Sequence, residues 1–142
     1  MTDTLDRFLK AQEHIYHTAL REICSGRKES HWMWFIFPQM RGLGMSDMAY
    51  IYGIADRAEA EAYLAHPVLS ARLNEITEVL LALDESNPNV IFYGIDAMKL
   101  RSSMTLFAAV SEDGSVFHRA LAKFFGGRAD QRTLELLGET EK

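Results

Sequence analysis

The chain has 142 residues, of which 48% are hydrophobic and 25% charged, and its formal net charge is −5. This composition is typical of a packed globular protein and excludes a largely disordered chain. The acidic balance lacks the overall basic field that nucleic acid requires, so we expect no nucleic-acid partner. No stretch has the pattern of a signal peptide or approaches the ~18 apolar residues of a membrane span, which predicts a cytoplasmic protein with no membrane contact.

The first third of the chain predicts two helices and an irregular connection. Apolar residues in the range 5–23 recur at spacings of three and four, which predicts one amphipathic helix. A short helix is expected over residues 31–37, because Pro38 disfavours helical geometry at the residue before it. Glycines then interrupt residues 42–53, where we expect loops and one helical turn at 46–51.

The rest of the chain predicts five more helices. Capping residues, glycines and apolar spacing place them at 57–64, 67–83, 96–110, 115–125 and 130–137. Asn87-Pro88-Asn89 is interpreted as a turn, and residues 90–93 as a short extended run. We therefore expect an all-α fold. It should be a compact single-domain bundle of about six or seven helices with irregular loops, spanning 1–142 with an ordered core of roughly residues 4–138.

Residues 31–40, HWMWFIFPQM, hold both tryptophans of the chain. Each indole has a large apolar surface and one N–H that needs a partner when it is buried, and His31 and Gln39 flank the pair as possible donors or acceptors. Two interpretations remain open. Either Trp32 and Trp34 fill the core, or they line a pocket and stack on a flat ligand. His31 is also a candidate catalytic residue, because an imidazole can exchange a proton near neutral pH.

A second informative stretch is IDAMKLRSSMTLF, residues 95–107. On a helix, Asp96, Lys99 and Ser103 lie at i, i+3 and i+7, with Ser102 beside them, so they form a polar face. A cation and two hydroxyls near the start of a helix can bind a carboxylate or phosphate. The alternative is that Asp96 caps the helix, the lysine is solvated and the serines bond back to the preceding turn.

Other chemical patterns are weaker. His14 and His17 lie at i and i+3, but no cysteine or carboxylate spacing completes a zinc pattern, so we expect no metal. No glycine-rich phosphate loop and no nucleophile-elbow motif occurs, and we expect no cofactor. An anionic small molecule is the candidate partner, and the sequence identifies no protein partner.

With these stretches in view, the sequence resembles the family known as domain of unknown function 1810. The resemblance covers roughly Asp6 to Leu137. It is carried by GRKESHWMWFIFPQMRGLG (26–44), HPVLSARL (66–73) and DAMKLRSSMTLF (96–107). It implies a mainly helical fold and brings no established activity. Because these segments hold a lysine, serines and other polar residues that core packing does not demand, the resemblance favours a pocket shared by the first and third segments.

A more remote likeness concerns Glu13-His14-Ile15-Tyr16, which is similar to the Glu-His-x-Tyr helix of the NADAR family of helical N-glycosidases. This resemblance implies that Glu13 is a candidate catalytic carboxylate, assisting departure of a base from ribose. It also implies that the tryptophans stack on that base and that Lys99, Ser102 and Ser103 hold phosphate. The spacing around the segment departs from the NADAR pattern.

Two functional hypotheses follow, and the sequence leaves open whether the chain is an enzyme. In the first, a pocket binds or hydrolyses a nucleotide-like or phosphorylated small molecule. Its ligand-binding residues are Trp32, Trp34, Gln39, Lys99, Ser102 and Ser103, and Glu13 and His31 are the catalytic candidates. In the second, the chain is a non-enzymatic interaction module whose aromatic segment belongs to the core.

Overall fold

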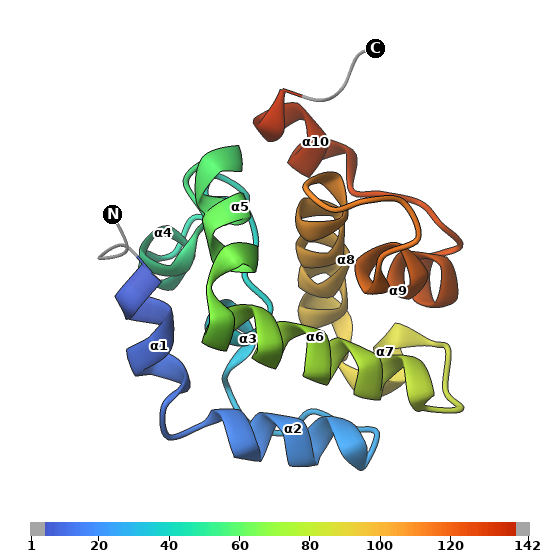
Figure 1. Ribbon diagram of the computed structural model, residues 1–142. Coiled ribbons are helices and arrows are strands. Elements are labelled where there is room, and N and C mark those ends of the chain that lie inside the picture. The colour runs from blue at the N-terminus through green and yellow to red at the C-terminus, as the bar shows by residue number, and fades with distance from the viewer. Residues whose placement is uncertain (1–4, 139–142) are drawn as a thin grey trace.

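All ten elements of the computed structural model, which describes residues 5–138, are helices (Figure 1). They are α1 (Asp6–Gln12), α2 (Tyr16–Cys24), α3 (Met33–Ile36), α4 (Asp47–Tyr52), α5 (Arg57–Ala65), α6 (Pro67–Ala82), α7 (Pro88–Ile91), α8 (Gly94–Ala109), α9 (Val116–Phe125) and α10 (Gln131–Leu137). The prediction of an all-α fold is confirmed, whereas the expected number of six or seven helices is wrong. None of these helices is long and apolar enough to cross a lipid bilayer.

Three local features account for the additional helices. The helix predicted over 5–23 is divided into α1 and α2, because the two halves pack on different partners, α3 and α6 respectively. Gln12 fixes the end of α1 by donating from Nε2 to the Phe35 carbonyl at 2.8 Å and to the Tyr63 hydroxyl at 3.1 Å. The helical turn expected near 46–51 is a full short helix, α4. Residues 88–91, expected as a turn and an extended run, form α7, which Asn87 caps.

Helix α8 stands in the middle of the molecule and packs against α5, α7, α9 and α10 (Figure 1). Its residues 102–108 are all buried, so this half of the helix is enclosed on every side. The first two turns differ, because Ile95 and Met98 are exposed and Asp96 and Lys99 are only partly covered. The polar face predicted on this helix therefore reaches the surface only at its N-terminal end, and Ser103 is fully buried.

The helix boundaries follow ordinary capping chemistry. Side-chain oxygens at the N-caps of α4, α5, α9 and α10 accept backbone N–H groups that have no partner inside the helix. Helix α9 ends at Gly126, whose φ of 63° lies in the left-handed region that suits glycine. These signals explain why the boundaries of the later helices were predictable from sequence.

The connection between α2 and α3 depends on the carboxylate of Glu22. It accepts the backbone N–H groups of Glu29 and Ser30 at 2.8 and 2.9 Å, the Ser30 hydroxyl at 2.6 Å and the Trp32 Nε1–H at 2.9 Å. Partial burial on its own raises the pKa of the Glu22 carboxyl, but these hydrogen bonds outweigh that effect and lower the pKa to about 2. One ionised side chain thus closes the loop and satisfies the buried indole.

We predict that Glu22 makes folding sensitive to acid. Because the folded-state pKa is below the ordinary value of about 4.5, its contribution to stability is complete above that pH and is lost as the pH falls towards 2. Urea unfolding at a series of pH values should therefore show a smaller loss of stability in this window for Glu22→Gln than for the wild type. The control is Glu13→Gln, at an exposed glutamate. Equal slopes for the wild type and Glu22→Gln would contradict this role.

Candidate functional site

A cavity of about 470 Å³ lies between the segment 34–46 and the exposed end of α8. We call it the Lys99 cavity. Its polar lining residues are Gln39, Ser46, Lys99, Ser102 and Asp130. Its apolar lining residues are Trp34, Leu43, Met45, Ile95 and Met98, and the backbone of Gly44 completes the wall. A few convergent polar groups within a mostly apolar wall are typical of small-molecule sites.

The structure brings four of the six predicted ligand-binding residues into this one cavity. Trp34 comes from α3, Gln39 from the following loop, and Lys99 and Ser102 from α8. This juxtaposition joins the two sequence segments that were expected to share a pocket. Their binding role stays a prediction, but their proximity is now a feature of the fold.

The loop that carries Gln39 is fixed by a short backbone bridge. The Gln39 carbonyl accepts the Ile54 N–H at 2.9 Å, and the Arg41 N–H donates to the Ile54 carbonyl at 2.8 Å. Gly53 allows this approach, since a Cβ there would lie 2.6 Å from the Cα of Arg41. The bridge holds the backbone of Gln39 in place, while its side chain lines the cavity.

Lys99 is held between an aromatic ring and a carboxylate. Its Nζ lies 3.5 Å from the centroid of the Trp34 ring, in cation–π geometry, and 3.6 Å from Oδ1 of Asp96. Asp96 also pairs through Oδ2 with Lys28 Nζ at 2.9 Å, and Lys28 is only 8% exposed. Two lysines therefore share one aspartate, which leaves one unit of positive charge unbalanced within this triad.

Two other polar groups of the cavity have unused hydrogen-bonding capacity. Gln39 is 9% exposed, and no hydrogen bond among the described residues involves its side-chain amide. Ser102 is also buried, and its hydroxyl reaches only the Met98 carbonyl at 3.3 Å. Because both side chains line the cavity, both can bond to water or to a ligand that occupies it.

The two tryptophans occupy different environments, although only one residue separates them. Trp32 is completely buried and donates Nε1–H to Glu22, so it belongs to the core. Trp34 is partly exposed and lines the Lys99 cavity. Both, together with His31, also border a small cavity of about 110 Å³ beside Lys99. The question of core or pocket therefore has a separate answer for each indole.

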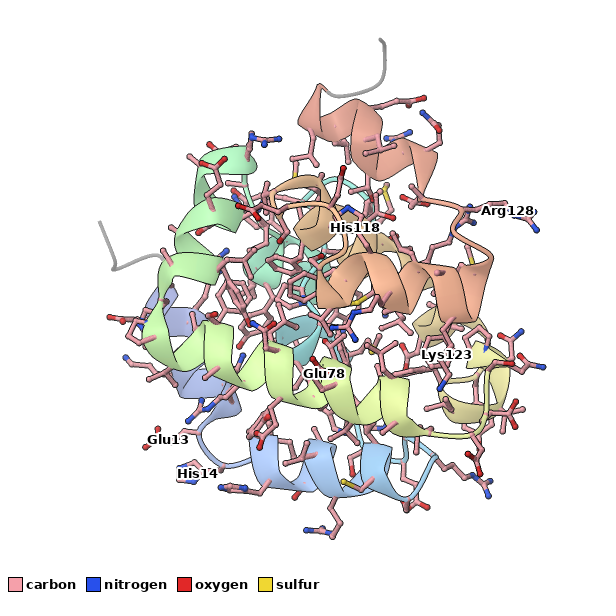
Figure 2. All side chains as sticks on the ribbon, turned by 45° about the vertical axis from the view of Figure 1, so that its right-hand side comes forward. Glu13, His14, Glu78, His118, Lys123 and Arg128 are labelled. Atoms are coloured by element: carbon pink, nitrogen blue, oxygen red, sulfur yellow. The ribbon has the colours of Figure 1, made fainter. Side chains whose placement is uncertain are left out.

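Four of the eight predicted site residues lie outside the Lys99 cavity: Trp32 and His31, which border the small cavity, and Ser103 and Glu13. Ser103 is fully buried in α8, and its Oγ has no hydrogen-bond partner within residues 5–138. Glu13 is exposed at the corner between α1 and α2, where Figure 2 shows it and His14 pointing away from the body of the molecule. The Glu13 carboxylate therefore does not lie beside this cavity, where the suggested catalytic role would require it.

Sequence reasoning missed Asp130 as a site residue. Its carboxylate caps α10 by accepting the Thr133 N–H at 3.0 Å and the Thr133 hydroxyl at 2.6 Å, both through Oδ2. The sequence predicted that Asp130 caps a helix, but it gave no sign that Asp130 also lines the cavity. Met45, Ile95 and Met98 were missed too. Their signal is exposure, since Met45 is fully exposed and the other two are each 69% exposed.

The fold and the site together define an all-α protein with a cavity lined by an indole, an ammonium group and an unpartnered amide. The chain belongs to the family described as Protein of unknown function (DUF1810), which matches residues 2–137. It is similar to a conserved hypothetical protein of Mycobacterium tuberculosis, Rv1873, whose crystal structure is known. The two sequences are 46% identical over 94% of this chain and 96% of that chain, and the structures agree with a TM-score of 0.92.

No curated protein matches the chain. The NADAR resemblance is not shown by the family match or the structural match. The family assignment therefore supports the helical fold, and an argument about function has to begin from the cavity.

We predict that truncating the two tryptophans has unequal effects on stability. Trp32→Ala should lower the free energy of unfolding by about 3–5 kcal/mol, because a fully buried ring and a satisfied N–H are lost. Trp34→Ala should cost clearly less, since this ring borders a cavity. Urea unfolding of the two variants under identical conditions measures the difference. Equal losses would show that Trp34 is a core residue after all.

Proposed function

We propose that this protein binds a small organic anion in the Lys99 cavity. The observation that carries the proposal is the meeting of Trp34, Gln39, Lys99 and Ser102 around one space of about 470 Å³. A nucleotide-like or phosphorylated molecule fits this description, because its ring can contact the apolar wall while its anionic group contacts the ammonium.

The charges of the triad support an anionic ligand. Lys28 and Lys99 have only Asp96 between them, so a ligand carboxylate or phosphate near Lys99 would balance the remaining positive charge. Such an ion pair is stronger in a partly enclosed cavity than in bulk water. The serine hydroxyl at 102 can rotate to donate to the same anionic group.

The remaining polar groups favour an organic ligand over a simple inorganic ion. Asp130 adds negative charge to the cavity wall and would repel a small anion next to it. A larger molecule can turn its acidic group towards Lys99 and offer a hydroxyl or amino group to Asp130. The Gln39 amide can both donate to and accept from such a molecule.

The alternatives of hydrolysis and of a pure interaction module have less support. Glu13, the carboxylate suggested for base departure, does not line the cavity, so the proposal is one of binding. If the aromatic segment only filled the core of an interaction module, Trp34 would be expected to be buried. Instead it borders a cavity beside Lys99. The wholly buried Trp32 fits both hypotheses and does not discriminate between them.

We predict that Lys99→Met abolishes stabilisation by the ligand. Thermal melting of the wild type is measured against nucleotides, sugar phosphates and simple anions. At 100 times its dissociation constant a ligand adds about 2.7 kcal/mol of stability, which raises Tm by several degrees. The shift should vanish in Lys99→Met and persist in Lys10→Met, which removes an exposed lysine from α1. A compound that stabilises all three proteins equally would not bind as proposed, and a panel without any hit would count against the proposal.

We also predict unequal effects of one substitution at two glutamines. Gln39→Leu should leave the free energy of unfolding nearly unchanged, because the Gln39 amide makes no protein hydrogen bond and faces the cavity, while it weakens ligand binding. Gln12→Leu should destabilise the protein, since Gln12 bonds Phe35, Tyr63 and Arg72. Urea unfolding and ligand titration of both variants test this. A loss of stability in Gln39→Leu comparable to that in Gln12→Leu would assign Gln39 a structural role.

A further inference from the structure

A second, larger cavity of about 620 Å³ lies at the N-terminal end of α8, and the proposed ligand site does not account for it. We call it the Tyr93 cavity. Its lining includes the aromatic residues Phe92 and Tyr93, the basic residues Arg27 and Lys28, and the acidic residues Glu29 and Asp96. Tyr93 is the accessible ring, at 48% exposure, whereas Phe92 is buried. A ligand group entering this cavity would therefore meet Tyr93 first.

The small cavity adjoins both the Tyr93 cavity and the Lys99 cavity, because it shares lining residues with each. The small cavity shares Lys28, His31 and Asp96 with the Tyr93 cavity, and it shares Trp34 and Lys99 with the Lys99 cavity. Ile95 lines both of the larger cavities. The three spaces thus follow one another along the first turns of α8, with an aromatic side chain at each end.

The groups between the two ends are charged. Lys28, Asp96 and Lys99 form a chain of two ion pairs, at 2.9 and 3.6 Å, and they border the small cavity. With two cations and one anion, this bridge is complementary to a negatively charged linker. Lys28 is more than nine-tenths buried, so its charge is built into the fold and is not a mobile surface charge.

Tyr93 itself is held in an unfavourable conformation. Tyr93 is the N-cap of α8 and has a φ of 63°. Among residues 5–138 it is the one non-glycine residue with a positive φ. Arg27 donates from Nε to its hydroxyl and lies over the ring, at 5.7 Å from the centroid. Glycine would hold a positive φ at lower cost than tyrosine, so the ring is present at a position whose backbone disfavours it.

We propose that the Tyr93 cavity is a second subsite for the same ligand, which is then a molecule with two flat groups joined by an anionic bridge. One flat group contacts Trp34 in the Lys99 cavity, the other contacts Tyr93, and the bridge lies over Lys28, Asp96 and Lys99. This inference rests on the proposed function, because the first subsite is the Lys99 cavity. It adds the chemical class of the ligand, a two-ring molecule of the dinucleotide type.

The test compares two probes that share a diphosphate and differ in the number of rings, ADP and diadenosine diphosphate. Amide and indole NMR signals report each subsite separately: Trp34 Nε1–H for the Lys99 cavity, the Gly94 N–H for the Tyr93 cavity, and the buried Trp32 indole as an internal reference. The two-ring probe should shift both Trp34 and Gly94 and bind at least about tenfold more tightly than ADP, which should shift Trp34 alone.

The matched variant is Tyr93→Gly, which removes the ring and tolerates the positive φ, so the protein should stay folded. It should abolish the advantage of the two-ring probe and leave the affinity for ADP unchanged. If both probes bind the wild type equally, or if Gly94 never responds, the second subsite is overturned while the Lys99 cavity stands. If neither probe gives a Lys99-dependent shift at Trp34, the proposed function fails and this inference fails with it.

Discussion

The carboxylate of Glu22 is the constraint on which the arrangement of the site depends. It gathers four donors from residues 29–32, so the loop after α2 closes tightly and Trp32 enters the core with its N–H satisfied. The same loop carries Lys28, whose backbone N–H donates to the Ile91 carbonyl at 2.8 Å. The ammonium of Lys28 is thereby brought to Asp96 on α8. This anchor adds to the contacts of Lys99 with Trp34 and of Phe37 with Phe92, which also hold the aromatic segment against the start of α8.

Burial then decides where chemistry is possible on α8. Residues 102–108 are enclosed on every side, so charges there would be desolvated without compensation. Asp96 and Lys99 lie at the partly exposed end, where they can pair with each other and with Lys28. A buried ion pair contributes little net stability, because desolvation offsets its attraction. The polar cluster therefore adds little to the stability of the fold, and under the proposed function its role is to recognise the ligand.

Much of the fold could be predicted because its signals are local. Capping residues, glycines and apolar periodicity predicted α5, α6, α8, α9 and α10 but not α7. The break between α1 and α2 depends on contacts of Gln12 with distant residues. The proximity of Trp34 and Lys99 also depends on tertiary packing. The sequence could suggest it only because the segments 26–44 and 96–107 both contain polar residues that core packing does not demand. Asp130 escaped notice because its capping role already explained it. The different fates of Trp32 and Trp34 depend on Glu22, which no local pattern connects to them.

The strongest argument for the proposed function lies at two residues that line the adjoining cavities, Gln39 and Tyr93. Elsewhere a buried glutamine, Gln12, makes three hydrogen bonds within the protein. The side-chain amide of Gln39 lines the Lys99 cavity without a hydrogen-bond partner among the described residues, and at Tyr93 a bulky residue holds a positive φ. Glycine would hold this φ at lower cost than tyrosine. Because both residues line adjoining cavities along the same end of α8, the proposed two-ring ligand would contact both of them.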